Sequence, residues 1–539
     1  MSRPNPLILF GVSLIVIAIM AGLSLSKGAL LISAHEGDTY HLLDILFRME
    51  RGQEPHRDFM TPLGLLSLWP ILVFLKAGYG IGTAILLSQV LVAAVMVVPV
   101  WYAAWSRLTR RTGYAFAAFS MVLILALTFG GTEPGLSISM HYNRWAWGVA
   151  WVLVIIALAP PRGNSWPAVE GLIYGIGFSA LVFLKVTFFV ALLPGVVLMM
   201  LLRRELFSMG VAVATGVAVA ILVTIIFGFD FWLGYIGDLI AVSQSDVRPY
   251  PGVAFPDMIS NPRSLAEVAV GFLSYLFVSR SGHSVSALGL ILLLPGFFFI
   301  AYQNFGNDPK WLVPMAAVLI ALRPEAGTRI VNGVDMRTAL TMTTLAAVMI
   351  FSTSAFTLTL SPLRQFAQQI ERYDPMLPAL PRHQDIVVRK DRAYTLTAKI
   401  NLDQPNSVWG KYRSLADRSK PPTLGGVTFP YCEILAGTSA WFNEISADLV
   451  AAEIPAGSQI FTTDILTAFW LFAPFEPLQN GAPWYYGNLS GIENADYVLV
   501  PKCNFVARVY GIMLHELAEA DLPLVLVREN DLYALFSLR

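Results

Sequence analysis

The sequence predicts a polytopic α-helical membrane protein with a water-soluble α/β domain at its C-terminal end. The chain of 539 residues is 56% hydrophobic and only 13% charged, whereas soluble domains carry about 25% charged residues. Long apolar runs fill the first 360 or so positions. After them the sequence turns polar and proline-punctuated, and it contains no further run long enough to cross a bilayer.

Apolar runs predict about eleven membrane-spanning helices, since roughly 17–25 residues cross the hydrocarbon core. These runs lie near residues 7–26, 80–105, 113–130, 145–160, 168–184, 186–202, 207–228, 264–279, 284–302, 310–322 and 337–360. The first lacks a clear small-residue cleavage site before Lys27, so we expect a retained helix and not a signal peptide. The run 62–75 is short and contains Pro70, so we expect it to lie in the interface without crossing.

Basic residues between the spans predict the orientation. If the N-terminus is cytoplasmic, the inside loops hold Arg107, Arg110, Arg111, Arg162, Arg203, Arg204, Arg280, Arg323, Arg329 and Arg337. The loops near 131–144 and 229–263 then face outward, as does everything after residue 360. We therefore expect a multi-pass protein of the inner (plasma) membrane, with a transmembrane domain at 1–360 and an extracytoplasmic domain at 361–539.

The predicted C-terminal domain carries both strand and helix patterns. "SQIFTTD" and "ADYVLVP" indicate strands, "NFVARVYGIMLHELAEA" has helical spacing, and "LPLVLVRENDLYALFSL" indicates a closing hairpin. Cys432 and Cys503 are the only cysteines of the chain. They either pair in an oxidising compartment or remain two separate buried thiols, and the sequence leaves both open.

The first outward loop, "AHEGDTYHLLDILFRMERGQEPHRDFMTPLG" from Ala34, concentrates charge that is otherwise scarce in this part of the chain. Residues 38–51 have the spacing of an amphipathic helix, which we expect to rest on the membrane surface. A carboxylate beside a bilayer is partly desolvated and is a candidate proton acceptor. Asp38 falls in the first turn, where the helix dipole favours a carboxylate, so a cap and a catalyst are both consistent with it.

The order of these features resembles the GT-C superfamily of membrane glycosyltransferases, which includes protein O-mannosyltransferases, the lipid A aminoarabinose transferase and mycobacterial arabinofuranosyltransferases. Its members carry an essential acid early in the first outward loop, followed by a pattern like G-x-x-P-x-x-D and a Pro-Leu pair. Here Gly52, Pro55, Asp58 and Pro62-Leu63 stand in that order. The resemblance covers residues 1–360 in architecture but only the first outward loop in motif.

The resemblance implies that a carboxylate takes the proton of an acceptor hydroxyl while cationic groups hold the phosphate of a polyprenyl-phosphate sugar donor, with inversion at the sugar. By this resemblance we assign the role of the essential acid to Asp38, with Glu36 as its substitute and Asp58 as a third catalytic candidate. Many relatives have adjacent Asp-Glu or a lone Asp, whereas this chain has Glu36-Gly37-Asp38. We expect no cofactor, although two such carboxylates also suit a divalent cation. The expected partners are the lipid-linked donor, a glycan, lipid or protein acceptor, and membrane lipids.

Polar residues of the outward loops are the candidates for substrate binding: His56, Arg57, Glu133, His141, Asn143, Arg144, Lys185 and Arg248. Arg144 either binds phosphate or joins Trp145 and Trp147 in an interfacial belt. Lys185 lies within a long apolar stretch, where it either binds phosphate or snorkels to water from a tight outward hairpin. The loop containing Arg248 is either a lid over the donor or a connector.

Other functions remain open at this stage. "NGAPWYYGNLSG" places Trp484, Tyr485 and Tyr486 on a glycine-flanked loop, where they either stack on sugar rings or pack internally. A transporter or flippase of a lipid-linked glycan is the first alternative function, although paired inverted halves are not visible. A non-catalytic scaffold that binds envelope glycan is the second. Nothing indicates nucleic-acid binding, because the net charge is zero and no basic tract occurs.

Overall fold

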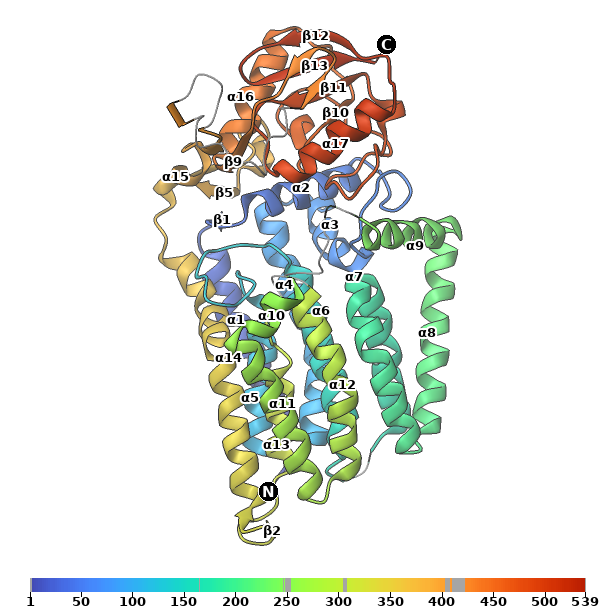
Figure 1. Cartoon of the computed structure of the whole chain (residues 1–539). Coiled ribbons are helices and arrows are strands. Elements are labelled where there is room, and N and C mark those ends of the chain that lie inside the picture. The colour runs from blue at the N-terminus through green and yellow to red at the C-terminus, as the bar shows by residue number, and fades with distance from the viewer. Residues whose placement is uncertain are drawn as a thin grey trace.

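The computed structural model describes residues 2–163, 165–245, 247, 254–303, 308–402, 408–409 and 422–538. A helical bundle forms the N-terminal part, and a mixed α/β region of residues 368–538, here the C-terminal region, covers one end of it (Figure 1). The N-terminus lies at the opposite end of the bundle. We call the covered end the site end and the other the N-terminal end.

The bundle contains fourteen described helices, some of them short. They are α1 (Pro6–Leu25), α2 (Glu36–Glu50), α3 (Trp69–Lys76), α4 (Ile81–Arg107), α5 (Arg110–Leu125), α6 (His141–Leu158), α7 (Pro167–Leu202), α8 (Leu206–Phe227), α9 (Asp230–Ser243), α10 (Phe255–Ser260), α11 (Pro262–Arg280), α12 (Ser284–Gln303), α13 (Leu312–Ala321) and α14 (Met336–Ala367). A short hairpin, β2 (Ile330–Val331) and β3 (Val334–Asp335), precedes α14.

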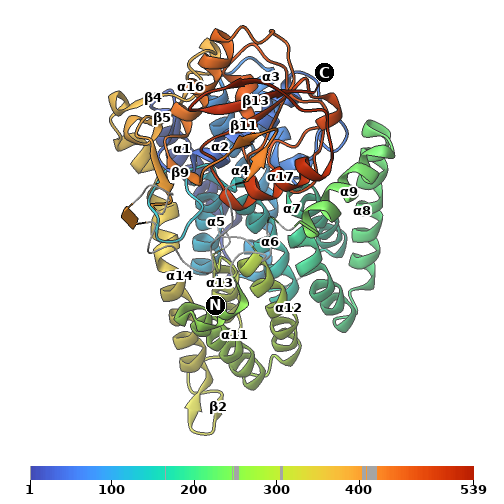
Figure 2. The same cartoon turned by 45° about the horizontal axis from the view of Figure 1, so that its top comes forward.

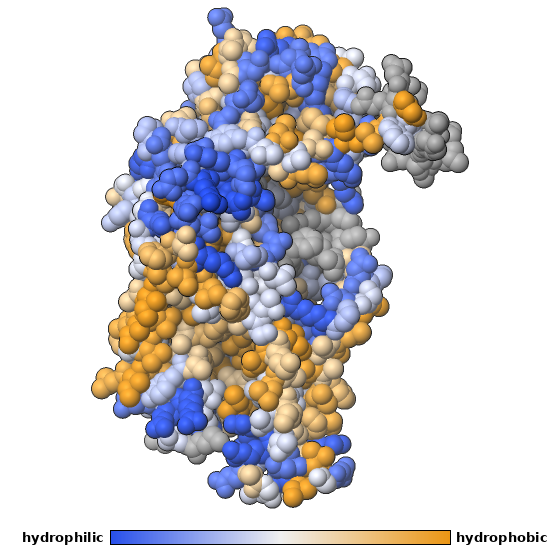
Figure 3. All heavy atoms as spheres, turned by 90° about the vertical axis from the view of Figure 1, so that its left-hand side faces the viewer, coloured by the Kyte–Doolittle hydropathy of each residue, from blue (hydrophilic) through white to orange (hydrophobic). Residues whose placement is uncertain are grey.

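Helices occupy every predicted span, but six of those described are long and apolar enough to cross a membrane by length and composition: α1, α4, α7, α8, α12 and α14. The remaining spans correspond to shorter or less apolar helices, so the total of about eleven stays a prediction. Figure 3 shows a broad apolar area between two hydrophilic ends on the face it presents. The run 62–75 forms a 3₁₀ turn at Leu65–Ser67 and the short helix α3, in line with a segment that does not cross.

Helix α7 corresponds to two predicted spans. Its backbone is extended at Lys185 (φ −161°, ψ 106°), which divides it into two helical segments. Glu170, near the start of the first segment, accepts a hydrogen bond from Arg107 at 2.7 Å. Arg203, directly after the second, lies close enough to interact electrostatically with both residues. The two segments therefore form a hairpin, with Lys185 at its turn.

Arginines from the predicted inside loops meet at the N-terminal end of the bundle. Arg162 donates to the carbonyl oxygens of Arg107 at 3.1 Å and Ala321 at 3.1 Å. Arg203 donates to the carbonyl of Leu158 at 2.9 Å. These contacts join the ends of α4, α6, α7 and α13, so the basic loops lie on one side, as the predicted orientation requires.

The C-terminal region contains the predicted strands, helix and closing hairpin. Its four-stranded sheet has the order β10 (Ile460–Thr462), β11 (Tyr497–Pro501), β13 (Tyr533–Ser537), β12 (Val525–Glu529), with β10 and β11 parallel and the other pairs antiparallel. The other elements are β4 (Tyr373–Pro375), β5 (Ile386–Arg389), α15 (Lys390–Ala393), β6 (Thr397–Ile400), β7 (Thr423–Leu424), β8 (Val427–Thr428), β9 (Cys432–Ala436), α16 (Thr438–Ala451) and α17 (Ala507–Glu519). Cys432 and Cys503 form a disulfide.

The first outward loop belongs structurally to both parts of the molecule. Its strand β1 (Leu30–Ile32) pairs in parallel with β5, which also pairs with β4. Helix α2 then lies between the bundle and the C-terminal region (Figure 1). Because α14 also runs past residue 360, the division of the chain at that residue stays a prediction.

Helix α2 has the predicted helical spacing, but the centre of its polar face is buried under the C-terminal region and does not face water. Asp44 and Arg48, 0% and 1% exposed, form an ion pair at 2.6 Å. The Asp44 carboxylate also accepts hydrogen bonds from Thr467 at 3.1 Å and Trp470 at 3.2 Å. The predicted helix is therefore confirmed, and the C-terminal region, not water, covers Asp44 and Arg48 on its polar side.

Asp44→Ala should destabilise the protein by about 3–5 kcal/mol, because it leaves the Arg48 guanidinium buried without its charged partner. The measurement is unfolding of the detergent-solubilised protein, followed by tryptophan fluorescence. Arg51→Ala is the matched control. It breaks the exposed pair with Glu476 and should cost at most about 1 kcal/mol. Equal losses in the two variants would contradict a structural role for the buried pair.

Candidate functional site

A cavity of about 540 Å³ at the site end brings together several parts of the chain. Asp38 and His41 enter it from α2, and Ser139 and His141 from the second outward loop and the start of α6. Lys185 enters from the turn of α7. Other lining residues come from α9, the end of α12 and the C-terminal region: Leu239, Val242, Ser243, Phe299, Gln303, Trp484 and Tyr486.

Asp38 presents its carboxylate to this cavity. The N-cap position of α2 is held by His35, whose backbone is left-handed (φ 59°), so Asp38 is not the cap. Its carboxylate accepts a hydrogen bond from the hydroxyl of Ser139. Ser137 in turn accepts from the backbone N–H of Ser139 at 3.0 Å, which fixes the local course of the second outward loop. A half-buried carboxylate held by one hydroxyl and open to a cavity is suited to accept a proton.

Lys185 supplies a cation to the same cavity. Its ammonium lies 5.6 Å from the ring centre of Tyr142, another lining residue. The extended backbone at Lys185 places this residue at the turn of the hairpin, as the snorkelling alternative also required. A cation and a carboxylate thus share one cavity at the end of an apolar bundle.

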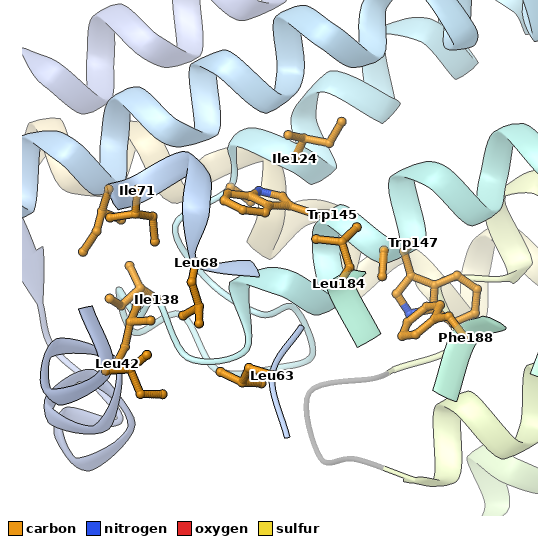
Figure 4. Close-up of a cluster of buried hydrophobic side chains, with 14 of the residues drawn as sticks. Leu42, Leu63, Leu68, Ile71, Ile124, Ile138, Trp145, Trp147, Leu184 and Phe188 are labelled. Carbon is orange, nitrogen blue, oxygen red and sulfur yellow. The ribbon is translucent and has the colours of Figure 1, made fainter. Parts of the chain in front are cut away.

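The lower wall of the cavity is apolar. Leu42, Leu63 and Ile138 line it and belong to a cluster of buried hydrophobic side chains (Figure 4). Leu42 and Ile138 face one another there, and the cluster continues through Trp145 to Phe188. An apolar wall beneath polar groups matches a ligand with a hydrocarbon tail and a charged head.

Aromatic side chains of the C-terminal region form the upper wall. Trp484 and Tyr486 line the cavity, and the Trp484 ring lies 4.9 Å from that of His41. Tyr485, between them, points away and donates to Glu516 at 2.7 Å. Two of the three aromatics therefore line the cavity and the third packs internally, while stacking on a sugar ring stays a prediction.

Two sets of contacts hold this aromatic loop in place. Its start is hydrogen-bonded to the first outward loop, from the N–H of Asn480 to the carbonyl of Asp58 at 2.9 Å. The backbone of Trp484 also forms an isolated antiparallel β-bridge with that of Leu466. Close to that bridge, Asp464 is fully buried and accepts backbone hydrogen bonds from Ile465 at 2.6 Å and Phe505 at 2.8 Å.

Of the predicted site residues, Asp38, His141 and Lys185 line the cavity. His141 also contacts the carbonyl of Ser67 at 2.8 Å through its ring Nε2. Both carboxylate oxygens of Glu36 are engaged by Arg392, one of them at 2.9 Å, so Glu36 ties α2 to α15. Among the described residues, no group of three or more His, Cys, Asp or Glu side chains is placed to hold a metal ion.

The other predicted residues of the first outward loop lie outside the cavity lining. Asp58 accepts from the backbone N–H of Glu54 at 2.7 Å and shapes its own loop. Arg57 is exposed and pairs with Glu54 at 3.2 Å. His56 is buried and contacts Asp238 of α9 at 2.8 Å.

Glu133, Asn143 and Arg144 do not line the Asp38 cavity either. Glu133 lines a second cavity of about 570 Å³, together with Arg263 and Glu267. Asn143 and Arg144 are buried at the start of α6 and line neither cavity. Arg248 lies outside the described residues.

Ser139, the partner of Asp38, was missed by the sequence reading. It lies in "GLSISMHYNR", where several serines are equivalent by composition. The left-handed backbone of Met140 (φ 53°), directly before α6, sets the direction of this segment. A methionine gives no sequence signal for that conformation, because glycine or asparagine usually marks it.

Comparison with known proteins gives little further information. No protein-family model and no curated protein matches the chain. Among solved structures, it is similar to the crystal structure of the Archaeoglobus fulgidus oligosaccharyltransferase in complex with zinc and sulfate. The identity is 12% and the TM-score 0.36, over 91% of this chain and 68% of that chain. A likeness at this level does not assign the protein to a family.

The contribution of Asp464, which lies close to the aromatic loop, to the stability of the protein should depend on pH. Burial raises the pKa of Asp464 to about 7, against the opposing effect of its backbone hydrogen bonds. In the unfolded chain an aspartate titrates near 4. Between about pH 4 and 7 the folded state therefore binds more protons, so this group's contribution to stability falls as pH rises through that window and levels off above it.

The expected result is a decrease in the unfolding free energy of the wild-type protein from pH 5 to pH 8 that is smaller in Asp464→Asn. Denaturant unfolding of the solubilised protein at several pH values measures it. Asp521→Asn, an exposed aspartate of the same region, should leave the slope unchanged. A wild-type slope that persists in Asp464→Asn would mean that another group titrates.

Proposed function

We propose that this protein is a membrane glycosyltransferase that moves a sugar from a polyprenyl-phosphate donor to a hydroxyl group of a cell-envelope glycan, lipid or protein. The observation that carries the proposal is the cavity shared by Asp38 and Lys185, with an apolar wall below and two aromatic rings above. The resemblance of the first outward loop to membrane glycosyltransferases supports the same assignment.

The proposed reaction is a single displacement. The Asp38 carboxylate takes the proton of the acceptor hydroxyl, and the acceptor oxygen attacks the anomeric carbon. The bond between that carbon and the phosphate oxygen breaks, and polyprenyl phosphate leaves with the electron pair. Inversion at the sugar follows from attack opposite the leaving group. Ser139 holds the carboxylate in position through its hydroxyl.

The proposed roles of the other groups follow from their chemistry. The Lys185 ammonium stabilises the phosphate as its charge grows. Leu42, Leu63 and Ile138 contact the first part of the lipid chain. Trp484 and Tyr486 offer aromatic faces to the acceptor sugar. The clustered arginines support a cytoplasmic N-terminal end, and the cavity and the C-terminal region would then lie on the outer side of the plasma membrane.

A lipid-linked glycan transporter is the main competing function, and a glycan-binding scaffold is the other. Neither requires a proton acceptor in the cavity. The charge that a transporter needs along its path is expected near the middle of the membrane, whereas Asp38 and Lys185 lie at one end of the bundle.

Asp38→Asn should lower kcat by about 10²- to 10⁴-fold with little change in KM, because the amide keeps the size of the side chain but cannot take a proton. The assay supplies the solubilised protein with a panel of undecaprenyl-phosphate hexoses and pentoses and an envelope glycan extract, and it measures released undecaprenyl phosphate. Glu54→Gln, an acid on the same loop with an exposed side chain, should retain wild-type turnover. Undiminished turnover in Asp38→Asn would defeat the catalytic assignment.

Lys185→Met should reduce kcat/KM by about 10- to 100-fold, the effect of losing a charge-assisted hydrogen bond to the phosphate. Lys185→Arg should recover part of the loss, because it keeps the positive charge. Lys76→Met removes a surface lysine at the end of α3 and serves as the control. If kcat/KM of Lys185→Arg is as low as that of Lys185→Met, the positive charge at position 185 is not what stabilises the phosphate.

A further inference from the structure

Helices α8 and α9 stand apart from the rest of the bundle. Figures 1 and 2 both show them at its edge, joined to each other and beside α7. All of α8 is described, and Ser208 is its only buried residue. Trp232 of α9 donates to Thr224 of α8 at 2.8 Å, so the two helices are also joined through side chains. Helix α8 packs along α7, where Gly171 and Gly175 lie directly against it, but few of its side chains are buried.

One face of α9 nevertheless packs tightly on the first outward loop. Phe231, Gly234, Tyr235 and Asp238 follow one another at helical spacing, so they share that face. Gly234 touches the backbone carbonyl of His56 so closely that any side chain there would collide with it. The Tyr235 ring lies 4.6 Å from the His56 imidazole, and its hydroxyl donates to the carbonyl of Val182 at 2.7 Å.

Asp238 makes the polar contacts of this face. One of its carboxylate oxygens, Oδ2, accepts from the ring Nδ1 of His56 at 2.8 Å and from the backbone N–H of Thr61 at 3.1 Å. The His56 side chain is fully buried, and that of Asp238 is 15% exposed. Among the residues that the structure describes, none is a hydrogen-bond partner of the other ring nitrogen of His56. A buried carboxylate and imidazole that satisfy one another are costly to separate.

The residues that follow Asp238 on α9 form a wall of the site. Leu239, Val242 and Ser243 line the cavity that contains Asp38 and Lys185. They lie within about one and a half helical turns of Asp238, so any movement of α9 at this contact is transmitted to the wall. Phe299 and Gln303, at the end of α12, line the same cavity.

We infer that His56 and Asp238 are positioning residues, whose hydrogen bond fixes α9 as the side wall of the Asp38 cavity and so sets its affinity for the lipid-linked donor. The donor part of this inference rests on the proposed function. His56 thus acts through α9, and it does not need to touch substrate. Without the contact, α9 populates positions in which the cavity is open along that side.

Two readouts test the inference on the full-length protein. The first is thiol accessibility. Because Cys432 and Cys503 are bonded to each other, Val242→Cys adds the single free thiol, at a half-buried wall position. Its reaction with a water-soluble maleimide should accelerate about fivefold or more when Asp238→Ala is added, because a smaller fraction of molecules has α9 packed on the first outward loop.

The second readout is kinetic. In Asp238→Ala, KM for the lipid-linked sugar should rise about fivefold, while kcat stays within about twofold of the wild-type value.

Two variants separate this role from general damage. Asp238→Asn keeps an oxygen that can accept from both His56 and Thr61, so it should restore the slow thiol reaction and the low KM. Asp230→Ala removes an exposed carboxylate from the same helix and should have no effect. If Asp238→Ala does not fold, His56→Phe is used, because it keeps the ring packing and removes the donor.

The outcomes distinguish this inference from the proposed function. Thiol reactivity needs no turnover, so faster labelling in a protein without transferase activity supports the positioning role and rejects the proposed function. Unchanged labelling in Asp238→Ala and His56→Phe overturns the positioning role, whatever the transferase activity. Faster labelling that Asp238→Asn fails to reverse also overturns it.

Discussion

The buried ion pair of Asp44 and Arg48 determines where the groups of the site lie. Helix α2 carries Asp38 and His41 toward the cavity, and the C-terminal region carries the aromatic loop. The pair joins the two, because Asp44 also accepts from Trp470 and Arg48 donates to the carbonyl of Leu478 at 2.7 Å. Removing two charges from water is favourable only when their remaining hydrogen bonds are satisfied. One docked position of the C-terminal region on α2 satisfies all of these groups together.

Around this contact, the cavity combines three environments that rarely occur together. The carboxylate and the ammonium lie at the end of the bundle, aliphatic side chains lie beneath them, and aromatic rings lie above. The first outward loop supplies the carboxylate and most of the aliphatic side chains, the turn of α7 supplies the ammonium, and the C-terminal region supplies the rings. The proposed donor has a charged head and a hydrocarbon tail. It fits this combination because the head is stable in polar surroundings and the tail in apolar ones.

Much of the architecture could be predicted from the sequence, because apolar length and basic-residue placement are local signals. The hairpin at Lys185 and the strands of the C-terminal region are examples. The site could be predicted only in part. Asp38 and Lys185 stood out because charge within or beside apolar sequence is costly. Glu36 looked equivalent to Asp38, yet Arg392, far along the chain, engages it. His56 looked like a ligand for substrate, yet it contacts Asp238. Such partners are brought together by tertiary packing, so they cannot be predicted from the residues that are neighbours in the sequence.

The pairing of β1 with β5 has a consequence for biogenesis. Leu30 and its partner Ile386 are separated by most of the polypeptide. At about 5–20 residues per second, the ribosome needs roughly 20–70 s to make the chain between them. During that time the segment around Asp38 has left the translation machinery without the strand that completes its sheet. The Asp38 cavity is therefore completed late in the maturation of this protein, because the C-terminal region that supplies Trp484 and Tyr486 is also made late.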